Sequence, residues 1–152
     1  VYDPVHEELF TAIAGQGAKM NDTPIRVSPT QTLASCLIAT GFPFRRTGDM
    51  GAYLNLVGQL MTRTMGLRRM GSAAIDLAYT ACGRYDAFYE THLKPWDVAA
   101  GVLLVQEAGG TVTQFDGQPY RLFDETLIAS NNAIHAEMQH IISNFSTIDF
   151  PY

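Results

Sequence analysis

The spacing of apolar residues predicts that helices and strands alternate along most of this chain. Between residues 53 and 65, apolar side chains recur every three or four positions, which is typical of an amphipathic helix. Asn131 or Asn132 is predicted to cap a closing helix that runs to about Asn144. Short apolar or alternating runs predict strands at residues 1–2, 8–12, 36–40, 67–70, 85–90, 111–115 and 126–129. This succession predicts a layered α/β domain.

Another helix is predicted to begin after Gly71 and Ser72 and to run to Cys82, because Gly83 follows. Ser72 is the expected N-cap, and we expect Asp76 to lie on the exposed side. The unpaired N–H groups at this helix start suit a phosphate or a hydroxylated ring. Glycine and serine are also ordinary residues before a helix, so this signal is weak by itself.

The segment from residue 94 to residue 101, KPWDVAAG, places a carboxylate at the start of a further helix. Pro95 cannot extend a helix backward without losing a hydrogen-bond donor, Asp97 is a favoured N-cap, and residues 98–108 read as a buried small-residue helix. We expect the indole of Trp96 to anchor this turn. A metal ion or a phosphate would lie at such a place. The simpler interpretation is that Asp97 only caps the helix, which stabilises it by about 1 kcal/mol.

Several chemically active residues follow predicted strands or begin predicted helices, and these ends form the ligand crevice of α/β sheets. Glu90 lies seven residues before Asp97, so the two carboxylates could line one pocket. Arg68 and Arg69 could neutralise a phosphate, or they could pair with surface carboxylates. The residues that we place in this crevice are Arg68, Gly71, Ser72, Ala73, Glu90 and Asp97.

Composition narrows the class of protein. Ten basic and fifteen acidic residues give a net charge of −5, which argues against a nucleic-acid surface. No apolar run reaches the roughly 18 residues of a membrane span, and no secretory leader is recognisable, so we expect a cytoplasmic protein without a membrane partner. Cys36 and Cys82 form no C-x-x-C pair, so reduced thiols are expected.

Other motifs of catalysis are missing from the sequence. It contains no phosphate-binding G-x-x-x-x-G-K-[ST], no H-E-x-x-H, no G-x-S-x-G and no dinucleotide fingerprint. His135 and His140 are five residues apart, which is the wrong spacing for a shared helix face. We therefore interpret both histidines as surface residues.

Six segments of the chain form a pattern in their order and spacing. They are Tyr2-Asp3-Pro4, Glu8 to Ala12, Gly15 to Ala18, Ala39 to Pro43, Arg69 to Leu77 and Lys94 to Gly101. Taken together, they resemble the inositol monophosphatase family from residue 1 to about residue 142. The likeness is strongest to the bacterial extragenic suppressor branch of that family, and the Trp-Asp and Gly-Ser-Ala-Ala motifs are its most specific parts.

The resemblance implies Mg²⁺-dependent hydrolysis of a phosphate monoester, in which a metal-activated water attacks phosphorus in line. Asp97 matches the metal-ligating aspartate of the family, and is thus the implied catalytic residue. Glu90 matches the carboxylate that binds a substrate hydroxyl. Gly71, Ser72 and Ala73 match the helix start that contacts the substrate. Arg68 and Arg69 are left as residues of the rim or of a dimer contact.

The resemblance also implies a layered α-β-α sugar-phosphatase-like fold that lacks its amino-terminal part. Residues 1–29 would be the last hairpin and strands of an amino-terminal α+β region, and residues 30–152 a carboxy-terminal α/β domain. The Gly-Glu-x-Glu-like and Asp-Pro-x-Asp-Gly-Thr segments that supply most family metal ligands do not occur. We therefore expect the back part of a longer phosphatase, with poor activity by itself.

Several alternatives remain open at this point. The substrate could be inositol monophosphate, another sugar phosphate, histidinol phosphate or a nucleotide 3′-phosphate. The chain could instead be a noncatalytic module for dimerisation or for binding a transcription factor. The expected partners are a small phosphorylated polyol and a second copy in a homodimer, with a transcription factor as a further candidate and no direct nucleic acid.

Overall fold

The computed structural model of the chain describes residues 1–42 and 50–143. Pro43, within the family-like segment at residues 39–43, and Asn144, the predicted end of the closing helix, lie outside these residues. The helices are α1 (Met50–Arg63), α2 (Ala73–Ala81), α3 (Pro95–Glu107) and α4 (His135–Ser143), with a short 3₁₀ turn at Leu33–Ser35. None of the helices in the described part is long and apolar enough to cross a membrane.

Five strands form the central sheet, in the order β6-β5-β7-β9-β8. β5 and β7 are parallel, as are β5 and β6, whereas β9 runs antiparallel to β7 and β8. The carboxyl ends of the three parallel strands therefore meet at one edge of the sheet. The strands are β5 (Leu37–Thr40), β6 (Gly66–Arg68), β7 (Ala87–Thr91), β8 (Thr111–Thr113) and β9 (Thr126–Ser130).

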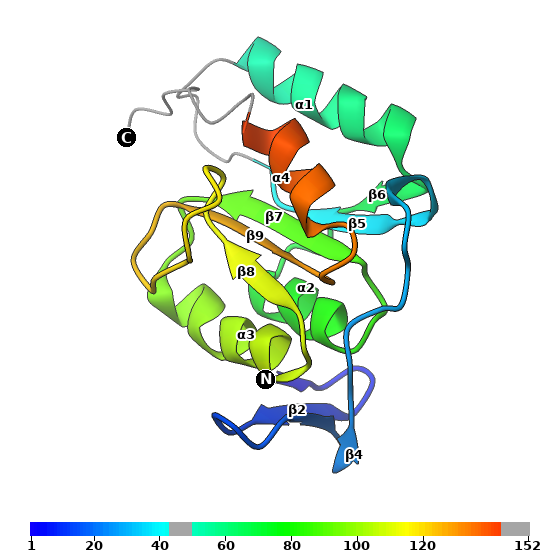
Figure 1. Cartoon of the computed structure of the whole chain (residues 1–152). Helices are drawn as coiled ribbons and strands as arrows, with labels where there is room; N and C mark the ends of the chain where they lie inside the picture. Colours follow the sequence, from blue (N-terminus) through cyan, green and yellow to red (C-terminus); the bar gives the residue numbers. More distant parts are fainter. Residues whose placement is uncertain (43–49, 144–152) are drawn as a thin grey trace.

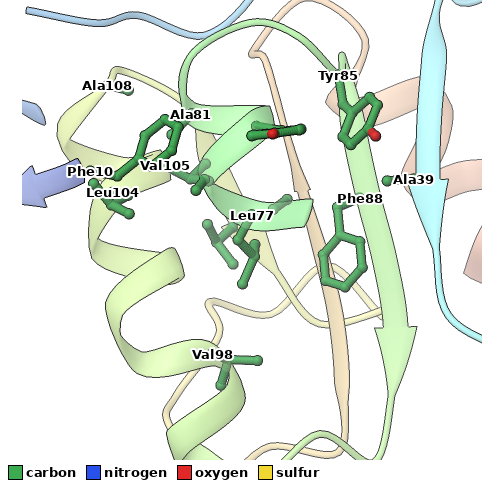
Figure 2. Close-up of a cluster of buried hydrophobic side chains, with 14 of the residues drawn as sticks. Phe10, Ala39, Leu77, Ala81, Tyr85, Phe88, Val98, Leu104, Val105 and Ala108 are labelled. Carbon is green, nitrogen blue, oxygen red and sulfur yellow. The ribbon is translucent and has the colours of Figure 1, made fainter. Parts of the chain in front are cut away.

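Helices cover both faces of this sheet, with α1 and α4 on one side and α2 and α3 on the other (Figure 1). The alternation of side chains along β7 shows why. Phe88 packs toward α2 and α3 (Figure 2), while its neighbours Ala87 and Tyr89 pack toward α1 and α4. All three side chains are buried, because a strand with helices on both faces points successive residues into two cores. The predicted layered α-β-α fold is confirmed.

A second, antiparallel sheet lies beyond α2 and α3 in Figure 1, with strand order β1-β2-β3-β4. Phe10 and Ala18 are buried in the same core as α2 and α3. Beyond the last strand of this sheet, the chain passes the end of α3, where the Val27 N–H group donates to the Ala108 carbonyl at 3.2 Å. The strands are β1 (Tyr2–Asp3), β2 (Glu8–Ala12), β3 (Ala18–Met20) and β4 (Thr23–Pro24).

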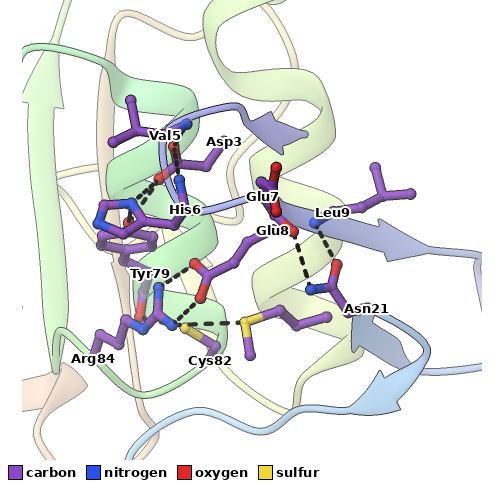
Figure 3. Close-up of polar contacts among 11 residues, drawn as sticks. Asp3, Val5, His6, Glu7, Glu8, Leu9, Asn21, Tyr79, Cys82 and Arg84 are labelled. Carbon is purple, nitrogen blue, oxygen red and sulfur yellow. Dashed lines mark hydrogen bonds and ion pairs between the residues drawn. The ribbon is translucent and has the colours of Figure 1, made fainter.

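Polar contacts join this small sheet to the layer formed by α2 and α3 (Figure 3). Tyr79 of α2 donates a hydrogen bond to Asp3 at 2.8 Å, and Arg84 forms a two-pronged ion pair with Glu8 at 2.5 and 2.6 Å. Glu107, the last residue of α3, accepts hydrogen bonds from the backbone N–H groups of Gly15 and Gly17 at 2.8 Å each. The division of the chain after residue 29 stays a prediction.

Two predicted surface positions are corrected by the structure. Asp76 is only 1 % exposed, because α2 is covered by the sheet on one side and by α3 on the other. His135 is partly buried, since its ring nitrogens lie 2.7 Å from Ser130 Oγ and 2.9 Å from Thr113 Oγ1. His140 is exposed, as predicted. Cys36 and Cys82 are free thiols, as predicted.

Candidate active site

The predicted site residues lie at the edge of the central sheet where the parallel strands end. α2 follows β6 and α3 follows β7, so both helices begin at this edge. Glu90 stands near the end of β7, one residue beyond the pairing of Tyr89 with Thr40 of β5. The topology thus brings Glu90, Asp97 and the start of α2 to one end of the sheet.

Asp97 occupies the third position of α3 and is not its N-cap, which corrects the sequence interpretation. The N-cap is Lys94, whose backbone N–H donates to Asp97 Oδ2 at 2.9 Å. Pro95 occupies the first helical position, where its missing N–H costs nothing, and this places the helix start one turn earlier than predicted. Asp97 is partly buried, and its Oδ1 atom makes no hydrogen bond with the described residues.

Trp96 does not anchor this turn as predicted. Its side chain is 81 % exposed, because the second position of α3 faces away from the core that Val98 enters. The turn is held instead by Pro95 and by the hydrogen bond between Lys94 and Asp97.

Gly71, Ser72 and Ala73 form the start of α2. Gly71 has a φ of 91°, a conformation that favours glycine, and a Cβ at this position would meet the guanidinium of Arg69 at 2.6 Å. Ser72 is the N-cap residue, as predicted, but its side chain makes no capping hydrogen bond. The hydroxyl and the first N–H groups of the helix are therefore available to another partner.

Glu90 lies against Gly41, at the end of β5. A Cβ built on Gly41 would fall well within 3.0 Å of the Glu90 carboxylate, so only glycine leaves room for that side chain. Burial raises the pKa of Glu90 to about 7, and the nearby carboxyl of Asp76 raises it further while Arg69 lowers it. Tyr53 of α1 donates a hydrogen bond to the Gly41 carbonyl at 3.0 Å, which ties α1 to the chain beside Glu90.

Three residues around Glu90 were not predicted as parts of the site. Gly41 makes room for Glu90, Tyr53 holds the Gly41 carbonyl, and Asp76 adds a second buried carboxyl. A carboxylate within an otherwise apolar helix was the available signal for Asp76. Arg68 and Arg69 are exposed, and the guanidinium of Arg69 lies 5.7 Å from the centre of the Phe42 ring.

Asp97 is suited to supply one oxygen ligand of a Mg²⁺ site, because its Oδ1 atom lies at a helix start and makes no hydrogen bond with the described residues. Within residues 1–42 and 50–143, the one group of three adjacent metal-ligand side chains is Asp3, His6 and Glu8, on the small sheet. Its oxygens are already occupied by Tyr79, His6 and Arg84, which disfavours a metal there (Figure 3).

Comparison with known proteins matches this architecture to one family. A family model described as the inositol monophosphatase family matches residues 1–148. Nus factor SuhB of Escherichia coli (strain K12) is 48% identical over 131 residues, which are 86% of this chain and 49% of that protein. The Pseudomonas aeruginosa (strain PAO1) protein of the same name is 49% identical over 133 residues, with the same coverage of 86% and 49%.

A solved structure supports the fold and the branch. The extragenic suppressor protein suhB from Bartonella henselae is 43% identical, with a TM-score of 0.87, and the alignment covers 93% of this chain and 54% of that one. The chain thus spans about half the length of the relatives it matches. The family match, the SuhB relatives and the shared layered fold show that this chain belongs to the inositol monophosphatase family.

Proposed function

We propose that this chain is the carboxy-terminal part of a Mg²⁺-dependent phosphate monoester hydrolase that acts on inositol monophosphate. Family membership supports phosphatase chemistry. The observation that carries the proposal is the meeting of Asp97, Glu90 and the start of α2 at the carboxyl edge of the parallel strands. This arrangement combines a metal-binding oxygen, a hydroxyl acceptor and a set of anion-binding N–H groups.

Asp97 is the proposed metal-binding and catalytic residue. Its Oδ2 atom is held by the Lys94 N–H group, which leaves Oδ1 for the cation. When bound there, Mg²⁺ would supply Lewis-acid activation of water and of the phosphoryl oxygens. Because one carboxylate is a small share of an octahedral shell, we expect this chain alone to hold Mg²⁺ weakly and to be a poor catalyst.

Gly71, Ser72, Ala73 and Glu90 are the proposed substrate-binding residues. The glycine lets a ligand approach the backbone closely, and the first N–H groups of α2 favour negative charge. Glu90 would accept a hydrogen bond from a ring hydroxyl, which distinguishes a polyol phosphate from a phosphate without neighbouring hydroxyls. We propose a homodimer in the cytoplasm as the working form.

The test is phosphate release from inositol 1-phosphate by the purified protein, with and without Mg²⁺, together with its intact mass. Release that depends on Mg²⁺ supports the proposal. Equal release with and without Mg²⁺, or a preference for histidinol phosphate or a nucleotide 3′-phosphate, contradicts the assigned cation or substrate.

The name of the SuhB relatives as Nus factors favours a second candidate function, in which the scaffold binds a transcription partner. Binding of this kind needs no metal ion. We expect Asp97→Ala to leave binding to the transcription machinery unchanged if this second function applies. Loss of that binding together with turnover would argue against a separate, noncatalytic role.

A further inference from the structure

The Glu90 carboxylate lies directly beside the backbone of Gly41. A Cβ built on Gly41 would fall well within 3.0 Å of the carboxylate carbon and of both its oxygens. The carboxylate thus occupies the space that a side chain at position 41 would need. A shift of the Gly41 backbone would therefore change the space that is open to the carboxylate.

Side-chain hydroxyls hold the Gly41 carbonyl. β5 ends at Thr40, and the pairing of Thr40 with Tyr89 is the last one in the register of β5 with β7. Gly41 lies just beyond these paired residues, and glycine has more backbone freedom than any other residue. Tyr53 of α1 donates a hydrogen bond to the Gly41 carbonyl at 3.0 Å, and the Thr40 hydroxyl lies 3.1 Å from the same oxygen.

The Thr40 hydroxyl has a second acceptor within reach. It lies 3.0 Å from the Tyr89 carbonyl, which belongs to the peptide bond that leads into Glu90. A threonine hydroxyl carries one hydrogen, so it cannot donate fully to both carbonyls at once. While Tyr53 donates to Gly41, the hydrogen of Thr40 is available for Tyr89. The two hydroxyls then hold the backbone beside the Glu90 carboxylate and the backbone that leads into Glu90.

Both hydroxyls are suited to this task at neutral pH. Burial, with a smaller contribution from the charge of Glu90, raises the pKa of Tyr53 to about 12. The phenol therefore keeps its proton near pH 7 and remains a donor. Thr40 is 1 % exposed, so water competes little for its hydrogen.

Tyr53 reaches the site from a helix that supplies none of the predicted site residues. α1 covers the face of the central sheet opposite α2 and α3 (Figure 1). The start of α2 and Asp97 of α3 come from that other face. The contact between Tyr53 and Gly41 thus joins the two layers of helices at the edge where Glu90 lies.

We propose that Tyr53 is a positioning residue for Glu90. Its hydroxyl holds the Gly41 carbonyl and leaves the Thr40 hydroxyl to the Tyr89 carbonyl, so that the Glu90 carboxylate keeps one place from which it accepts a substrate hydroxyl. The role of Glu90 toward substrate rests on the proposed function. The place of its carboxylate beside Gly41 does not depend on that function.

Nuclear Overhauser effects between the Cα hydrogens of Gly41 and the side-chain methylene hydrogens of Glu90 test the positioning directly, in the 152-residue chain without metal or substrate. We expect Tyr53→Phe to weaken or abolish this signal. The matched control is Tyr79→Phe, which removes a tyrosine hydroxyl that donates to Asp3 at 2.8 Å on the small sheet. It should leave the signal unchanged. An unchanged signal in Tyr53→Phe, or equal weakening in both variants, would overturn the proposal.

A double substitution tests the division of the two carbonyls between the two hydroxyls. In Tyr53→Phe, the Thr40 hydroxyl is free to turn toward Gly41 and replace part of the lost contact. Adding Thr40→Val should therefore weaken the signal by more than the two single substitutions predict together. Additive effects would contradict the shared use of the carbonyls. If Thr40→Val folds poorly, the comparison of Tyr53→Phe with Tyr79→Phe still decides the positioning.

Kinetics of Mg²⁺-dependent phosphate release test the consequence for substrate. Tyr53→Phe should raise KM for inositol 1-phosphate by about fivefold, the equivalent of one hydrogen bond, while kcat stays within about twofold. In a Glu90→Ala background the same substitution should raise KM no further, because the group that Tyr53 positions is gone. An equal rise in that background, or a fall in kcat alone, would contradict a positioning role. No phosphate release by any variant would count against the proposed function, while the nuclear Overhauser effects still decide the place of Glu90.

Discussion

Gly101 of α3 lies directly on Leu77 of α2. A Cβ built on Gly101 would fall 2.5 Å from the Cβ atom of Leu77, closer than real Cβ atoms approach. The two helices therefore pack at a separation that only glycine permits. This separation matters for the candidate site, because α2 carries Gly71 to Ala73 at its start and α3 carries Asp97 at its start.

Gly101→Ala should lower the free energy of unfolding by about 1–3 kcal/mol, because the added methyl group must push the two helices apart. Chemical denaturation measures this change. The matched control is Gly58→Ala in α1, where a Cβ meets nothing within 4 Å. That substitution should stabilise the protein by up to about 1 kcal/mol through helix propensity. Equal effects of the two changes would contradict the close packing.

Asp97→Asn should lower Mg²⁺-dependent phosphate release by roughly tenfold or more, because the amide oxygen is a neutral and weaker ligand. Folding should be nearly unchanged, since the amide oxygen can still accept the Lys94 N–H group. Phosphate release and thermal unfolding are measured on the same preparation. The exposed turn residue offers the control Asp116→Asn, and turnover that is equal in the two variants would overturn the role of Asp97.

Glu90→Gln should raise KM for inositol 1-phosphate more than it lowers kcat, because the amide accepts a hydroxyl less strongly than a carboxylate does. Steady-state kinetics at fixed pH separate the two constants. Gly41→Ala should act in the same direction, since the added Cβ would displace the Glu90 carboxylate. Unchanged kinetics in Glu90→Gln would remove Glu90 from the substrate site.

The free energy of unfolding should fall in mild acid because of His135. Burial lowers the pKa of His135 below the ordinary value of 6.5, so the unfolded chain takes up a proton more readily than the folded one. Its contribution is thus fully present above pH 6.5 and is lost as the pH falls from there through the lowered pKa. Asp76 and Glu90 act in the opposite sense, because their raised pKa values remove stability as the pH rises toward 7.

Urea unfolding at a series of pH values, compared between the unmodified protein and His135→Gln, isolates the contribution of His135. The variant should lose less stability between pH 6.5 and acid than the unmodified protein does. His140→Gln is the control, since His140 is exposed. A pH dependence that both substitutions reduce equally would show that the partial burial of His135 is not the cause.

The order of elements and the location of Asp97 could be predicted because their signals are local. Pro95 and Asp97 are separated by a single residue, and a helix start needs only its own first turn to be recognised. The exact cap could not be predicted, because lysine is not a favoured N-cap residue and only the hydrogen bond from the Lys94 backbone N–H to Asp97 reveals its position. Trp96 was misplaced for a similar reason, since its neighbours along the chain do not reveal which side of α3 faces the core.

The sequence by itself determined the alternation of helices and strands, the family, and the residue types available for chemistry. Only the tertiary structure decided that Asp76 is buried and that Glu90 lies against Gly41. Hydrophobic periodicity reports a single buried face of an element, whereas α2 is covered by α3 as well as by the sheet. Burial from two sides depends on residues far apart in the chain, and it is this burial that alters the charge of a carboxyl.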